Sequence, residues 1–99
     1  FFGAPAAIFC YVDRDMGPPQ WSDLGMFLQT FMLLAQEAGL DTCAQEAWAM
    51  KHDSVSTFLQ TAESDMLFCG MAIGYKDQDA TINQLKTSRR SSDEWMKFI

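Results

Sequence analysis

Residues 22–39 have the sequence SDLGMFLQTFMLLAQEAG, and this stretch decides the fold because it has the clearest periodicity in the chain. Apolar side chains recur there every three or four residues, the spacing of one helix face. They are Leu24, Phe27, Leu28, Phe31, Leu34, Ala35 and Ala38. Ser22 and Asp23 suit an N-terminal cap and first turn, and Gly39 suits the left-handed residue that follows a helix. The stretch predicts one long helix.

The other faces of this helix are also apolar. Met26, Met32 and Leu33 lie outside the main stripe. An apolar surface wider than one stripe is expected of a helix that packs on two sides or against another subunit.

Two segments on either side of the helix have the length and composition of buried strands. Residues 6–12 are apolar, contain β-branched and aromatic side chains, and stop at the charged Asp13. Residues 66–75 are apolar, and Gly70 and Gly74 within them indicate close approach by another backbone or a ligand. Two strands alone do not make a stable sheet, so we expect a second copy of the chain or further sequence to complete it.

The segments between the helix and the second strand are shorter. Residues 40–45 are expected to be a polar connection, and residues 46–51 a short helix with Trp48 on its inner side. Residues 55–62 carry apolar side chains at helical spacing, with Asp53 or Ser54 available as N-cap. With the last quarter of the chain, the expected order of elements is strand, long helix, one or two short helices, strand, loop and helix.

The last quarter of the chain is mostly polar. Residues 76–90 are expected to be a loop anchored by Ile82 and Leu85. Ser91 and Glu94 then have the spacing of a capping box, which predicts a helix that includes Trp95.

Composition limits the classes of function. The 99 residues carry 7 Lys and Arg against 13 Asp and Glu, a net charge of -6 that repels phosphate backbones and argues against nucleic-acid binding. The longest apolar run, residues 66–75, is about half of what spans a bilayer, so no membrane attachment is expected. Eight Phe and three Trp exceed the needs of one small core and indicate a partner surface. Three widely spaced cysteines favour a reducing cytoplasm over a disulfide framework.

Catalytic and metal sites have weak signals. Cys43 and His52 could form a thiol–imidazole pair, but carbonyls at the end of the long helix would disfavour a Cys43 thiolate. The two Asp-x-Asp patterns, residues 13–15 and 77–79, are typical of solvated turns. One imidazole does not make a zinc site, so no metal is expected. Arg89 and Arg90, flanked by two serines before a capped helix, could bind a phosphate group.

Four motifs carry a resemblance to a known family. They are Phe1-Phe2-Gly3-Ala4-Pro5-Ala6-Ala7-Ile8, Trp21-x-x-x-Gly25-Met26-Phe27-Leu28-Gln29, Gly39-Leu40-Asp41-Thr42-Cys43-Ala44-Gln45 and Cys69-Gly70-Met71-Ala72-Ile73-Gly74-Tyr75. Their order and spacing resemble the nitroreductase family, and Ile82-Asn83-x-Leu85-x-Thr87-x-Arg89 resembles the segment before that family's last helix. The resemblance covers nearly all 99 residues but only the second half of a typical member, and a start at Phe1 without Met is expected of a fragment.

The resemblance implies a partial nitroreductase-like domain over residues 1–99, with an α+β fold that has a long central helix and a small sheet. It implies that an intertwined homodimer or missing sequence completes this domain, with FMN at the subunit interface. It places the flavin ring against the turn of Ala44, Gln45, Glu46 and Ala47, with the main-chain amides of the last two near N5 and O4 of the ring. It assigns the FMN phosphate to Arg89, with Lys86 and Arg90 as weaker candidates. No side chain is implied to act as a catalytic acid or base.

The implied reaction passes hydride from NAD(P)H to the flavin and then electrons to a planar acceptor such as a nitroaromatic compound or quinone. Two departures support a rival interpretation. Ala44 stands where the family often has proline, and the family's N-terminal Arg-x-Ser-x-Arg segment is absent from these residues. The rival is a noncatalytic α/β dimerisation or binding module that has lost its flavin site.

Overall fold

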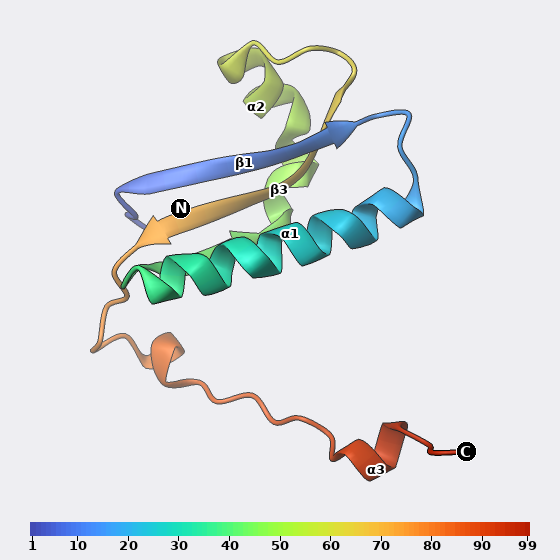
Figure 1. The fold of residues 1–99 in the computed structure, drawn as a ribbon. Coiled ribbons are helices and arrows are strands. Elements are labelled where there is room, and N and C mark those ends of the chain that lie inside the picture. Colours follow the sequence, from blue (N-terminus) through green and yellow to red (C-terminus); the bar gives the residue numbers. More distant parts are fainter.

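The computed structural model describes residues 1–99 and contains one three-stranded antiparallel sheet with the strand order β1-β3-β2 (Figure 1). The strands are β1 Ala6–Asp13, β2 Asp41–Gln45 and β3 Asp65–Gly74. The helices are α1 Pro18–Glu37, the 3-10 helix η1 Glu46–Lys51, α2 His52–Leu59, the 3-10 helix η2 Thr81–Gln84 and α3 Ser92–Trp95. The two expected strands and the long helix are confirmed.

Helix α1 begins earlier than the sequence predicted. It starts at Pro18, so Ser22 and Asp23 lie inside the helix instead of capping it. Proline is tolerated in the first turn, where its missing N–H has no helical partner, and the Gln20 Oε1 accepts a hydrogen bond from the Gly17 N–H at 3.2 Å. The other end is as expected, because Gly39 takes a positive φ of 79° and donates its N–H to the Gln36 carbonyl.

The expected polar connection at residues 40–45 is wrong, because most of it forms β2. Residues 41–45 pair with residues 70–74 of β3. The hydrogen bonds of this pairing join backbone groups, so β2 can form without the alternation of apolar and polar side chains that usually marks a strand. The Asp41 side chain holds the start of β2 against the end of β3, because its Oδ2 accepts a hydrogen bond from the Lys76 N–H at 3.0 Å.

The sheet separates two packing layers. Antiparallel partners point to the same face, so the pairs Ile8–Met71 and Cys10–Cys69 lie on one side, where they pack with Leu28 of α1. Phe9 pairs with Gly70 on the opposite side, where it meets Trp48 of η1. Trp48 is therefore an inner residue, as expected, and it lies on the sheet face away from α1.

The two strand glycines allow the close approach that the sequence predicted, but side chains make it. A Cβ on Gly70 would lie 2.6 Å from Cδ1 of Trp48, and a Cβ on Gly74 would lie 2.7 Å from Cδ of Pro5. Trp48 and Pro5 thus fill the space that a side chain would need at these two positions, so packing within this chain accounts for both glycines.

Helix α2 begins at His52, directly after η1, so Asp53 and Ser54 lie within its first turn and do not cap it. The expected capping box of Ser91 and Glu94 is present, but the helix that follows ends at Trp95, and Met96 is extended. No helix is both long enough and apolar enough to cross a membrane.

The C-terminal segment, residues 76–99, leads away from the sheet and α1 (Figure 1). Ile82 and Leu85 are 73% and 69% exposed, so the expectation that they anchor this segment is wrong within the single chain. The Cα radius of gyration is 16.4 Å, compared with about 13 Å for a compact domain of this length. Only 9 of 99 residues are buried, which leaves much apolar surface uncovered.

Candidate functional site

The turn from β2 into η1 carries the four residues assigned to the flavin ring. Ala44 and Gln45 end β2, and Glu46 and Ala47 begin η1. The side chains of Ala44, Glu46 and Ala47 are exposed, so the chain does not cover this turn with its own side chains. The amides of Glu46 and Ala47 donate none of the backbone hydrogen bonds that lie outside helices and strands. The first amides of a helix also lack partners within it.

Trp48 supports this turn from the sheet side. Its Nε1 donates a hydrogen bond to Oε1 of Gln45 at 2.8 Å, and its ring stacks on Phe1 with centroids 4.5 Å apart. Gly70 provides the space for the indole. Sequence reasoning placed Trp48 inside but missed its hydrogen bond to Gln45; the three-residue spacing of the two side chains was the available signal.

The candidate phosphate ligands lie on the C-terminal segment, and both Lys86 and Arg89 are exposed. The Arg89 Nη1 donates to Oγ1 of Thr87 at 2.7 Å and to the carbonyl of Ser88 at 3.0 Å. The part of this segment that leads to α3 runs apart from the sheet, so a single chain does not bring that part to the turn at residues 44–47 (Figure 1).

A cavity of about 520 Å³ lies at the first residues of β2, and sequence reasoning did not predict it. It is bounded by the start of the chain, by the first residues of β2, by the end of β3 and by η2. Its wall includes Phe2, Cys43, Tyr75 and Asn83. Apolar side chains form about half of this wall, so the cavity can contact a partly apolar ligand or a further segment of protein.

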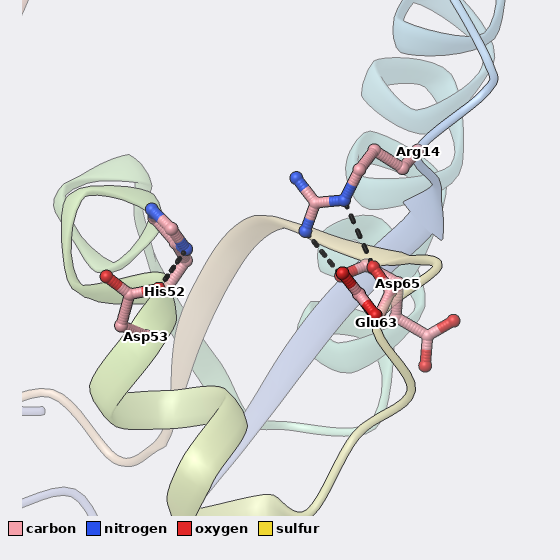
Figure 2. Close-up of polar contacts among 5 residues, drawn as sticks. All are labelled: Arg14, His52, Asp53, Glu63 and Asp65. Atoms are coloured by element: carbon pink, nitrogen blue, oxygen red, sulfur yellow. Dashed lines mark hydrogen bonds and ion pairs between the residues drawn. The ribbon is translucent and has the colours of Figure 1, made fainter.

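A polar region surrounds Arg14, which directly follows the last residue of β1 (Figure 2). The Arg14 Nε donates to the carbonyl of Glu63 at 3.1 Å, and Nη2 donates to the carbonyl of Asp65 at 3.3 Å. The Arg14 N–H also donates to the carbonyl of Ser64 at 2.7 Å. These contacts join the end of β1 to the loop before β3. Sequence reasoning treated Arg14 as part of a solvated turn and missed this role.

Cys43 and His52 do not form the thiol–imidazole pair considered above. Cys43 lines the cavity at the first residues of β2, whereas His52 lines the hollow beside Arg14. There the Nδ1 of His52 lies 3.1 Å from Oδ1 of Asp53 (Figure 2). The pKa of the Cys10 thiol is raised, first by burial and second by the neighbouring Cys69. The structure contains no group of three or more His, Cys, Asp or Glu side chains that could hold a metal ion.

Comparison with known proteins places this arrangement in a family. The model of the Nitroreductase family matches residues 1–75, most of the chain. The chain belongs to the nitroreductase family. The 4-nitrobenzoate reductase of Pseudomonas putida is 37% identical to it over 99 residues, which are 100% of this chain and 44% of that protein.

Solved structures of other nitroreductases share the fold. The FMN- and NADPH-dependent nitroreductase NfnB from sphigopyxis sp. strain HMH has a TM-score of 0.92 and 44% sequence identity, and the match covers 99% of this chain and 44% of that one. The FMN-dependent NfnB from Mycobacterium smegmatis, solved in complex with NADPH, has a TM-score of 0.93 and 26% identity over 99% of this chain and 44% of its own. These matches confirm a partial nitroreductase-like α+β fold. The chain spans less than half the length of each of these proteins.

Proposed function

We propose that residues 1–99 form part of an FMN-dependent oxidoreductase of nitroreductase type, which uses NAD(P)H to reduce a nitroaromatic or quinone-like acceptor. The observation that carries this proposal is the exposed turn at residues 44–47, in a chain whose relatives are named nitroreductases. Both solved relatives described above are FMN-dependent nitroreductases.

The residues of the turn fit one edge of a flavin ring. The amides of Glu46 and Ala47 are not used by loop hydrogen bonds, and both residues are exposed, so a ligand can reach them. Bound FMN would accept hydride and deliver electrons, chemistry that no side chain here needs to supply. The chain's contribution is a set of fixed donors beside the ring edge that becomes electron-rich on reduction, so little reorganisation is needed when the charge develops.

We propose that a homodimer completes the structure. Met26, Phe27, Leu33 and Leu34 of α1 are 57–62% exposed, which is unfavourable for four large apolar side chains in water. A second copy that covers this surface would also provide a body against which the C-terminal segment can pack. Lys86 and Arg89 are then proposed to bind the FMN phosphate as part of the assembled site, where a planar acceptor would stack on the ring.

The location of the protein is proposed to be cytoplasmic. Cys10, Cys43 and Cys69 are all free thiols, a state that a reducing compartment maintains.

The alternative is a noncatalytic dimerisation module that has lost its flavin site. Two observations favour it. The C-terminal segment that leads to α3 runs apart from the sheet (Figure 1), and the Arg89 guanidinium makes local hydrogen bonds to Thr87 and Ser88.

FMN titration distinguishes the two functions. The proposed enzyme quenches flavin fluorescence on mixing and gains melting temperature as FMN is added, because a ligand that binds only the folded state stabilises it. NAD(P)H should then bleach the flavin absorbance of the complex. If saturating FMN changes neither fluorescence nor melting temperature, the oxidoreductase is excluded and the noncatalytic module remains.

A further inference from the structure

The sheet places the three thiols of the chain on its two faces. Cys10 of β1 and Cys69 of β3 are direct partners in the antiparallel register, so their side chains lie on the same face, where they pack with Leu28 of α1. Cys43 of β2 pairs with Ala72 of β3, three residues beyond Cys69. Successive side chains of a strand point to opposite faces, so the sheet separates Cys43 from the other two thiols.

The backbone holds Cys10 and Cys69 at a separation that a disulfide can span. Opposing residues of an antiparallel pair have Cα atoms about 4.5–5.5 Å apart, within the range of about 4.4–6.8 Å found for disulfides. The register shifts directly after this pair, where Tyr11 pairs with Leu67 and Phe68 has no partner. Such a bulge interrupts the ladder of hydrogen bonds, so the backbone beside the pair can adjust to the geometry of an S–S bond.

The two thiols also interact with each other. Burial raises the pKa of Cys10, and repulsion from the neighbouring Cys69 raises it further, an effect that requires the two sulfur atoms to be close. The Cys69 Sγ donates a weak hydrogen bond to the Gly70 carbonyl at 3.2 Å, which it loses on turning toward Cys10. Cys69 is 2% exposed and Cys10 is partly exposed, so a small oxidant meets Cys10 first.

We propose that Cys10 and Cys69 are an oxidation site, which a hydroperoxide converts to a cross-strand disulfide. Hydrogen peroxide oxidises the Cys10 thiol to a sulfenic acid, and its O–O bond breaks with the release of one water. The Cys69 sulfur then attacks the Cys10 sulfur. The S–S bond forms as the sulfenic hydroxyl leaves with the Cys69 proton as a second water. One peroxide is thus reduced to two waters while two thiols lose two hydrogen atoms.

The disulfide links β1 to the central strand β3 and closes a loop that contains α1, β2 and the turn at residues 44–47. It needs no flavin, so it is independent of the proposed FMN binding. The raised pKa of Cys10 leaves little thiolate near neutral pH, so we expect the oxidation to be slow.

Tryptic peptides show which thiols are linked. The Lys and Arg residues separate the cysteines onto peptides 1–14, 15–51 and 52–76, so each possible disulfide gives a different linked mass. The folded protein is treated with hydrogen peroxide, its remaining thiols are blocked with N-ethylmaleimide, and it is digested without reduction. We expect peptide 1–14 linked to peptide 52–76 as the main disulfide. Cys10 recovered as a sulfinic acid or as the maleimide adduct, without this linked peptide, would overturn the proposal.

The same oxidation in urea is the first control, because loop closure then decides the pairing. The segment between Cys43 and Cys69 is less than half as long as the segment between Cys10 and Cys69. An unfolded chain therefore closes the shorter loop about threefold more often. The link from peptide 15–51 to peptide 52–76 should exceed the link from 1–14 to 52–76 in urea, and the order should reverse in the folded protein. The same order in both states would contradict the proposal.

Cys10→Ala and Cys43→Ala make the same change on opposite faces of the sheet. Cys43→Ala should form the linked peptide to the same extent as the unmodified protein. Folded Cys10→Ala should form no disulfide between Cys43 and Cys69, and one that formed would show that the sheet does not separate these thiols. Should Cys10→Ala fail to fold, the comparison of the folded and urea-treated protein decides alone.

The melting temperature shows whether the disulfide fits the folded sheet. The oxidised protein should melt about 5 °C or more higher before treatment with dithiothreitol than after it, because the cross-link restricts the unfolded chain. Dithiothreitol cleaves the disulfide and leaves oxidised methionines unchanged, so the comparison isolates the S–S bond. A lower melting temperature before treatment would show that the bond distorts the sheet, and it would overturn the proposal.

Discussion

At the scale of single residues, the absence of a side chain at Gly70 matters as much as any side chain that is present. The Trp48 indole occupies the space above Gly70, and it orients Gln45 from that position. The atoms that a new Cβ would meet belong to the inner part of the indole, which cannot swing aside as the end of a flexible chain can. The packing of one glycine is thus linked to the geometry of the candidate flavin turn.

Gly70→Ala should lower the free energy of unfolding by about 1–3 kcal/mol, because a methyl group forces the Trp48 ring out of its position. Urea denaturation followed by tryptophan fluorescence measures this change. Gly25→Ala is the matched control, since no atom lies within 4 Å of a Cβ built on Gly25 in α1. Helix propensity predicts that this control is stabilised by about 0.5–1 kcal/mol. Equal effects of the two substitutions would contradict the packing argument.

The three thiols should differ in their rates of alkylation. Burial and the neighbouring Cys69 raise the pKa of Cys10, so less of it is thiolate near pH 8 than of an ordinary cysteine. Cys69 is buried, and Cys43 is exposed. Labelling with iodoacetamide followed by peptide mass spectrometry should show that Cys43 is modified first. The rate at which Cys10 is modified should increase as the pH rises. Labelling of Cys10 before Cys43 would show that its environment is not the one described.

At the scale of elements, the edges of the central strand decide what its neighbours become. β3 has two edges, and β1 with its apolar residues covers one of them. The other edge pairs with β2, whose residues DTCAQ carry no strand pattern of their own. The Asp41 carboxylate adds a hydrogen bond to the Lys76 N–H, so the end of β3 and the start of β2 are held together.

Arg14 joins two elements by donating from its side chain to two backbone carbonyls. Arg14→Lys should cost about 1 kcal/mol of unfolding free energy, because an ammonium group cannot reproduce the forked pair of donors. Hydrogen exchange should quicken in the loop of residues 60–64. Arg90→Lys is the control with the same change in chemistry at an exposed site, and it should have no measurable effect. Unchanged exchange in Arg14→Lys would show that these hydrogen bonds do not hold the loop.

At the scale of the whole molecule, one chain leaves a large apolar surface in water. The sheet covers only one side of α1, and Leu28 and Ala35 are its buried residues. Phe27 and Leu34 belong to the stripe that predicted burial, and they are more than half exposed. The extended C-terminal segment adds further exposed side chains, with Trp95 at 65% and Phe98 at 88%. This surface is the basis of the proposed homodimer.

Leu33→Lys should convert the proposed dimer to a monomer, because it places a charge in the centre of a surface that must lose its water on association. Analytical ultracentrifugation across a range of protein concentrations measures the mass. Gln36→Lys, an equal change in charge at an exposed polar position of the same helix, is the control and should remain dimeric. A dimer that persists in Leu33→Lys would move the proposed interface away from α1.

Most of the elements were predictable from the sequence because their signals are local. The helical spacing of residues 24–38 and the apolar run of residues 66–75 lead directly to α1 and β3. The candidate site was predictable only as a set of residues. The family motif that ends at Gln45 identifies the turn, and the three-residue spacing of Gln45 and Trp48 allows their hydrogen bond without requiring it. No local pattern predicts the cavity beside Cys43, because its wall is built from segments that are distant in the sequence.

The sequence by itself determined the long helix, its left-handed end at Gly39, the two apolar strands and membership of the family. Each of these depends on side chains that are close in the chain. The tertiary structure alone decided that residues 41–45 form a strand, that Gly70 makes room for Trp48, and that the segment leading to α3 runs apart from the sheet. The reason is physical, because strand pairing, close packing and the course of an uncovered segment depend on groups that are distant in sequence and meet only when the chain has folded.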